Sequence, residues 1–100
     1  MEVRVAAEGE IPEGGVKIVQ AGSLFLGVYL IDGGYHALED RCSHDDGPLC
    51  EGVREGFEIE CPRHGARFDL RDGRVLSLPA TEDVEVFPVT VRDGDIWVSV

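Results

Sequence analysis

Short runs of apolar and β-branched residues, separated by glycine-containing turns, dominate the chain. Val, Ile, Leu and aromatic residues are typical of strands, and alternation with polar residues buries one face of a strand. Alternation is clearest in VEVF at residues 84–87 and in VTV at residues 89–91. Apolar residues do not recur at helical spacing for more than two turns. The pattern predicts strands at residues 16–20, 24–31, 35–38, 84–91 and 96–100.

Asp-Gly pairs divide these runs at residues 32–33, 72–73 and 93–94, and Glu55-Gly56 forms a weaker turn signal. Asp-Gly between extended segments favours a tight hairpin, because both residues tolerate positive φ. We therefore expect an antiparallel all-β fold of about eight to ten strands. The chain has 100 residues and neither a linker nor a repeat, so residues 1–100 are predicted to form one domain.

Two turn-rich segments interrupt the strand pattern, at residues 41–52 (RCSHDDGPLCEG) and 61–68 (CPRHGARF). They contain all three cysteines and two of the three histidines. Loops that project from a rigid sheet often carry the residues that bind ligands. These two segments are therefore the candidate functional loops.

The candidate ligands form two matched pairs, Cys42 with His44 and Cys61 with His64, separated by 16 residues. Thiolates and imidazoles suit zinc, copper or iron–sulfur chemistry and do not suit calcium or magnesium. Zinc fingers usually pair Cys with Cys and His with His along the chain, so the mixed pairs count against a zinc finger. A structural zinc-binding domain stays as an alternative.

The pattern Cys-x-His, a spacer, then Cys-x-x-His-Gly resembles the Rieske proteins. In them two cysteines hold one iron of a 2Fe-2S cluster and two histidines hold the other. The segments DRCSHDDGPLCEG and CPRHGARFDLRDGRVLSLPA are similar to the cluster loops of bacterial Rieske ferredoxins. The resemblance implies an antiparallel β-sandwich with a small cluster-binding subdomain formed by the two loops. It also implies one cluster, with Cys42 and Cys61 on the buried iron and His44 and His64 on the outer iron.

By this resemblance the chain is an electron carrier and not an enzyme. It would pass single electrons from a flavin-dependent reductase to a terminal oxygenase or another oxidoreductase. A Rieske oxygenase needs a further two-His, one-carboxylate iron site, and only His36 is left to build one. His36 is instead predicted to be a surface residue of a strand. A small accessory subunit of a larger, nitrite-reductase-like enzyme is a second alternative, although such subunits often lack the cluster ligands.

Departures from the Rieske proteins of respiratory complexes predict a low potential. Those proteins carry an extra disulfide between the loops, and the matching positions here are Gly47 and Arg63. They also place hydroxyl side chains, which donate hydrogen bonds to cluster sulfur, where this chain has Ala66 and Phe68. The reduction potential is therefore expected near the low end of the Rieske range, on the order of −150 mV.

The net charge of the chain counts against some classes of binding partner. The formal net charge of −11, from 20 acidic and 9 basic residues, counts against binding to nucleic acid or anionic membranes. No apolar run approaches the roughly 20 residues of a membrane span, and the acidic N-terminus does not resemble a signal peptide. Three cysteines do not suit a disulfide framework. We expect a soluble, cytoplasmic monomer. Its acidic surface either suits redox partners that are basic where they dock or serves only to keep the protein soluble.

Four further residues are given structural roles. Cys50 has no matching partner and is predicted to be a buried filler beneath the first loop. Trp97, on the last predicted strand, is expected in the core. Asp45 and Asp46 are interpreted as turn formers, with steering of a basic partner as the alternative.

Overall fold

The computed structural model describes residues 1–100 and contains ten strands in three antiparallel sheets. The first sheet has the order β1 (Glu2–Ala7), β10 (Asp95–Ser99), β9 (Val89–Arg92). The second has the order β2 (Val16–Ala21), β3 (Leu24–Ile31), β4 (Gly34–Glu39), β8 (Val86–Phe87). The third is small and has the order β5 (Arg54–Glu55), β6 (Glu58–Glu60), β7 (Arg67–Asp69). The structure contains no helix whose length and apolar character would let it cross a bilayer.

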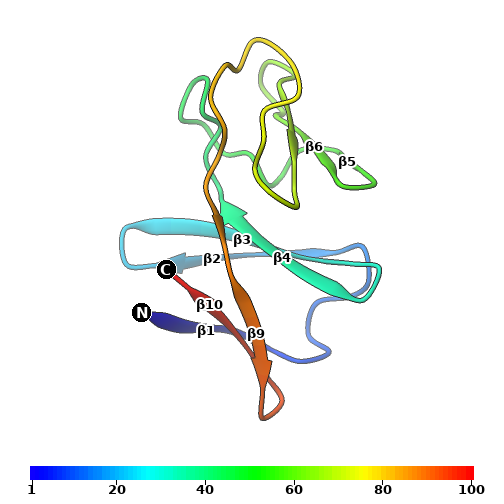
Figure 1. Cartoon of the computed structure of the whole chain (residues 1–100), viewed down its shortest axis with the longest axis vertical. Helices are drawn as coiled ribbons and strands as arrows, with labels where there is room; N and C mark the ends of the chain where they lie inside the picture. The colour runs from blue at the N-terminus through cyan, green and yellow to red at the C-terminus, as the bar shows by residue number, and fades with distance from the viewer.

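The two larger sheets pack together at one end of an elongated molecule with extents of 41 × 28 × 18 Å. The small sheet and the loops around it project from the other end (Figure 1). We call the end formed by the two larger sheets the base. Both termini lie in it, and the backbones of Met1 and Val100 are hydrogen-bonded to each other there. The expected β-sandwich with a small projecting subdomain is confirmed.

Strand β3 is buried on both of its faces. Leu26 and Val28 point into the core between the two large sheets, whereas Tyr29 and Ile31 belong to the core beneath the projecting subdomain. Side chains alternate between the faces of a strand, so burial on both faces requires an uninterrupted apolar run. This explains why the run at residues 24–31 shows no alternation of polar and apolar residues.

The predicted hairpins form at two Asp-Gly pairs. Asp32 and Gly33 have φ values of 51° and 78°, and Asp93 and Gly94 have φ values of 54° and 79°. These are the left-handed conformations that a tight hairpin of this kind requires. Gly56 also has a positive φ, of 58°, between β5 and β6. The turn expected there is confirmed.

Three expectations about strands and core were incomplete or wrong. Strands β1, β5, β6 and β7 are not among the predicted strands, and β7 begins inside the segment at residues 61–68 that was expected to be a loop. The single strand expected at residues 84–91 is instead β8 and β9, which are divided at Pro88 and belong to different sheets. A proline lacks the N–H group that a continuous ladder would need at this point. Trp97 is half-buried beneath Arg92, 4.5 Å from its guanidinium carbon, while its neighbours Ile96 and Val98 fill the core.

Candidate metal centre

The first candidate loop is closed by backbone hydrogen bonds around Cys42. The Cys42 N–H donates to the carbonyl of Gly47 (2.8 Å), and the Cys42 carbonyl accepts from the N–H of Asp46 (2.8 Å). Asp46 adopts a left-handed conformation with φ of 62°, which aspartate tolerates better than most residues. The expectation that Asp46 serves the turn is therefore confirmed.

The second loop repeats this framework around Cys61. The Cys61 N–H donates to the carbonyl of Ala66 (2.7 Å), and the Cys61 carbonyl accepts from the N–H of Gly65 (3.0 Å). Gly65 has φ of 80° and stands four residues after its cysteine, as Asp46 does in the first loop. The two loops therefore present their cysteines in the same backbone setting, although their sequences differ.

The two thiols lie together at the base of the loops. Cys42 and Cys61 are both buried, and their sulfur atoms lie within 4.8 Å of each other and of a carboxylate oxygen of Asp45. Burial raises the pKa of the Cys42 thiol, and the backbone N–H of His44 acts in the opposite direction. N–H groups that point at sulfur favour its anionic, metal-binding form.

The two imidazoles lie together at the exposed tip. The ring centroids of His44 and His64 are 5.1 Å apart and the ring planes are at 87°, so one ring presents its edge to the other. Both side chains are exposed to solvent. The structure therefore brings together all four predicted site residues, with thiols inside and imidazoles outside.

Asp45 lies between the thiol pair and the imidazole pair. Its Oδ1 accepts a hydrogen bond from the N–H of Gly47 (3.0 Å), which is the main cause that lowers the pKa of this carboxyl group. Its Oδ2 is 3.1 Å from Nδ1 of His64 and 3.3 Å from Nε of Arg63, yet it is buried without a well-formed hydrogen bond. An unsatisfied buried atom where two thiols and two imidazoles converge fits a site shaped for a further group.

Asp40 anchors the far end of the first loop, a role that the sequence analysis missed. Its Oδ1 accepts hydrogen bonds from the N–H groups of Leu49 (2.8 Å) and Cys50 (2.7 Å). The Tyr29 hydroxyl, from β3, donates to the carbonyl of Cys50 (3.1 Å). Cys50 is fully buried against Gly27, where an added Cβ would lie 2.3 Å from its sulfur. The predicted burial of Cys50 beneath the loop is confirmed.

Further contacts tie the two loops to each other and to the segment after β7. Positions 47 and 63 face each other, because Cδ of Arg63 would lie 2.9 Å from a Cβ added at Gly47. The Ser43 hydroxyl donates to the carbonyl of Glu82. These contacts join all three segments at the projecting end of the molecule (Figure 1).

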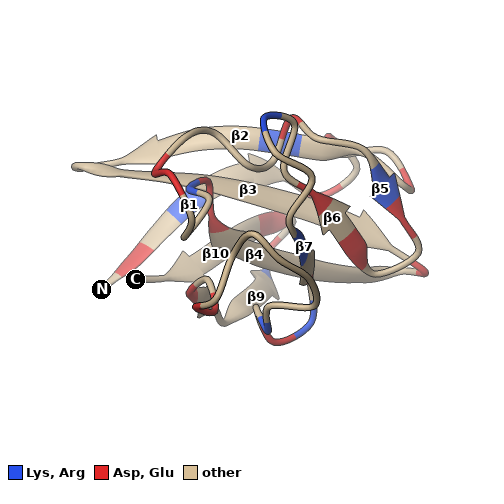
Figure 2. Ribbon diagram, turned by 90° about the horizontal axis from the view of Figure 1, so that it is seen from above, with Lys and Arg blue, Asp and Glu red and all other residues tan.

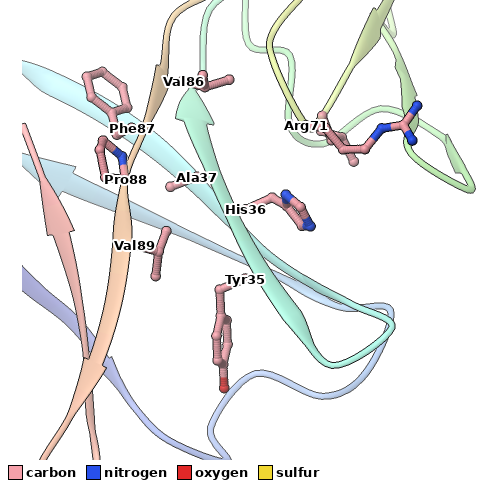
Figure 3. A pocket seen from close by; sticks show the side chains of 9 residues that line it. Tyr35, His36, Ala37, Arg71, Val86, Phe87, Pro88 and Val89 are labelled. Atoms are coloured by element: carbon pink, nitrogen blue, oxygen red, sulfur yellow. The ribbon is translucent and has the colours of Figure 1, made fainter.

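The third histidine lies elsewhere. His36 is a half-buried residue of β4, and its ring meets the ring of Phe57 edge-on with centroids 5.5 Å apart. It lines a groove with Arg71 and the segment around Pro88 (Figure 3). His36 therefore takes no part in the Cys–His cluster, in agreement with its predicted place on a strand.

Residues 1–88 match the Rieske [2Fe-2S] domain family. This chain belongs to the Rieske [2Fe-2S] family. Its cofactor is accordingly a Rieske-type 2Fe-2S cluster, and the donor set of two thiols and two imidazoles fits that group. This Rieske chain is 39% identical to the 3-phenylpropionate/cinnamic acid dioxygenase ferredoxin subunit of Photorhabdus laumondii, over 91% of the chain and 87% of that relative.

Solved structures agree with this Rieske assignment. The ferredoxin of carbazole 1,9a-dioxygenase from Nocardioides aromaticivorans IC177 superposes with a TM-score of 0.92 at 31% identity, over 98% of this chain and 96% of that one. A chain from a complex of reduced oxygenase and oxidized ferredoxin in carbazole 1,9a-dioxygenase has a TM-score of 0.92 at 34% identity. It covers 98% of this chain and 92% of that one.

Proposed function

We propose that this Rieske chain is the ferredoxin component of an oxygenase system, an electron carrier without catalytic activity of its own. It would receive single electrons from a flavin-dependent reductase and deliver them to a terminal oxygenase. Relatives named as ferredoxin components of dioxygenase systems support this role. A related ferredoxin in complex with an oxygenase supports the choice of acceptor.

We also propose how the cluster is held. Cys42 and Cys61 bind the inner iron through their sulfur atoms, and His44 and His64 bind the outer iron through imidazole nitrogens. The observation that carries the proposal is the division between two buried thiols and two exposed imidazoles, on loops with the same hydrogen-bond framework. Once bound there, the cluster would accept and release one electron at a time.

Different residues of the chain would serve different requirements of an electron carrier. The buried cysteines keep one side of the site away from water, which limits access of solvent and oxidants. The exposed histidines leave the opposite side open to a partner surface. The paired loops and Asp40 hold the four ligands in place, so little structural change would accompany the gain or loss of an electron.

We place the protein in the cytoplasm, as a monomer whose residues 1–100 form one domain. All three cysteines are free thiols in the structure. Thiols that bind metal or pack in a core are typical of proteins in a reducing compartment. This part of the proposal is tested by cell fractionation and by the molar mass of the purified protein.

The central test is the spectrum of the purified protein. We expect a red-brown protein with iron and acid-labile sulfide in equal amounts, and a Rieske-type paramagnetic resonance signal after reduction. Cys61→Ser and His64→Ala should each abolish that signal. Cys50→Ser, which changes a buried thiol outside the proposed ligand set, should retain it. A colourless protein containing zinc would instead support the structural zinc alternative.

A further inference from the structure

A groove of about 390 Å³ opens where the first cluster loop meets the hairpin of β2 and β3. We call it the Phe25 groove. It is lined by Ile18, Phe25, Asp40, Asp46, Pro48 and Glu51. Asp46 and Pro48 belong to the loop that carries His44, so any protein surface that covers this exposed imidazole is close to the groove.

The apolar part of the groove is an uncovered portion of a sheet face. Ile18 and Phe25 lie on the same face of the sheet as Gly27, because Ile18 pairs with Gly27 and Phe25 is two residues away along β3. Cys50 of the first loop covers Gly27. The loop does not cover its neighbours, so the Phe25 side chain is 50% exposed and Ile18 is 36% exposed.

The rest of the groove is acidic. Glu51 makes no ion pair or side-chain hydrogen bond in the structure, whereas Asp46 is bound to Arg41 and Asp40 holds the loop backbone. Figure 2 shows acidic segments spread along the ribbon. The excess of acids therefore attracts basic partners in general, and the half-exposed aromatic ring sets this groove apart.

The same combination of an aromatic ring and a carboxylate occurs elsewhere on this chain, where an arginine completes it. Arg71 lies over the ring of Phe57 at 4.7 Å from its centroid. Two of its nitrogens donate to the carboxylate of Asp69, at 3.0 and 2.9 Å. A planar guanidinium can stack on an aromatic face and bind a carboxylate through its edge at the same time.

A second example is found in the base of the molecule. Arg92 lies over Trp97 at 4.5 Å and forms an ion pair with Glu2 at 2.9 Å. The Phe25 groove has an aromatic ring and the free carboxylate of Glu51, but no arginine of this chain stacks on Phe25. The groove therefore has the aromatic ring and the carboxylate, and lacks only the arginine that joins such a pair at Phe57 with Asp69 and at Trp97 with Glu2.

We propose that the Phe25 groove docks an arginine side chain of the terminal oxygenase. This inference rests on the proposed function and names the contact that orients the complex. Electron transfer requires the exposed His44 side to approach the acceptor, and the groove belongs to the same loop. A ferredoxin of this fold has been solved in complex with an oxygenase, which supports the oxygenase as the partner. Arginine fits better than lysine, because only a planar group can stack on Phe25 while binding Glu51.

The test measures electron delivery by the cluster-loaded protein. Pre-reduced wild type, Phe25→Ser and Glu51→Gln are mixed with the oxidised oxygenases of the cinnamic acid and carbazole dioxygenase systems. The rate constant is measured at low and high salt. Both variants should slow delivery by about fivefold or more, and Glu51→Gln should also weaken its dependence on salt. A matched control, Val91→Ser with Glu8→Gln, removes one exposed apolar side chain and one unpaired acid from the base.

The possible outcomes distinguish a failure of the docking proposal from a failure of the proposed function. Oxidation by ferricyanide and the resonance spectrum should be the same in all variants, because neither involves the groove. If wild-type protein reduces an oxygenase and both groove variants reduce it at the same rate, the docking proposal is overturned and the proposed function is not affected. Reduction of the oxidised variants by the reductase of the same system is measured in parallel. A slower rate in this reaction alone, with wild-type delivery to the oxygenase, would overturn the choice of the oxygenase as the partner. Failure of the wild type to reduce either oxygenase would count against the proposed function itself.

Discussion

Asp40 provides the sharpest test of how the first loop is held. Its carboxylate accepts the N–H groups of Leu49 and Cys50, both of which are fully buried residues. Asp40→Leu keeps the branched shape of the side chain, replaces both acceptor oxygens with bulkier methyl groups and leaves the two N–H groups without a partner. Asp40→Asn keeps an oxygen acceptor and removes the charge.

The magnitude follows from the two hydrogen bonds. A hydrogen bond to a charged group contributes about 1.5–3 kcal/mol, and Asp40 is only half-buried, so the lower value applies to each bond. Asp40→Leu should therefore destabilise the closed loop by about 3 kcal/mol, equivalent to a roughly 100-fold rise in the open population. Asp40→Asn keeps neutral hydrogen bonds and should cost about 1 kcal/mol, or roughly fivefold.

The assay is the loss of visible absorption from the loaded protein in excess chelator, because cluster release requires the loop to open. Glu13 supplies a matched control, since its carboxylate also accepts two backbone N–H groups, from Asp32 (2.7 Å) and Gly33 (2.9 Å) in a hairpin of the base. Glu13→Leu should leave the release rate unchanged. Equal release rates for Asp40→Leu and wild type, or equal acceleration by Glu13→Leu, would refute the reasoning.

Three further predictions concern the second loop and its hairpin. Ala66→Ser with Phe68→Tyr should raise the reduction potential in film voltammetry, because hydroxyl donors stabilise the reduced cluster; an unchanged potential would contradict this. Gly65→Ala should destabilise the fold by about 1–2 kcal/mol, seen as a lower Tm, because φ is 80°. The hydrogen bonds from the Arg71 side chain lower the pKa of Asp69 in the folded protein. The ionised Asp69 therefore stabilises the fold fully above the unfolded pKa of about 4, and this contribution is lost as the pH falls through the lower folded pKa. Asp69→Asn should therefore flatten the acid limb of the stability curve, and an unaltered limb would refute it.

Much of the fold and the four candidate ligands could be predicted from local patterns. The Cys–His pairs are recognisable because each pair lies within four residues, and the hairpins because Asp-Gly marks positive φ. Strand β1 was missed although EVRVAA is as long as β2 and β4, and its pairing with β10 joins the two ends of the chain. That pairing also shifts register between Arg4 and Ala6. No local pattern contains such information.

Side-chain roles that depend on the tertiary structure could not be predicted. Asp40 precedes Cys42 by only two residues, yet its hydrogen bonds reach nine and ten residues ahead. The exposure of Phe25 could not be predicted from the sequence for a different reason. It lies in an apolar run whose other members are mostly buried, and only the limited reach of the first loop leaves it uncovered.

The shared framework of the two loops also explains why the histidines differ. In both loops the hydrogen bonds join the cysteine to residues four and five positions later, but His44 follows its cysteine by two residues and His64 by three. Matched backbones with unmatched histidine positions direct the two rings differently, as their 87° interplanar angle shows. The two imidazoles therefore offer unequal surfaces to a partner. His44 shares its loop with the Phe25 groove, so a partner that binds there meets His44 from a fixed side.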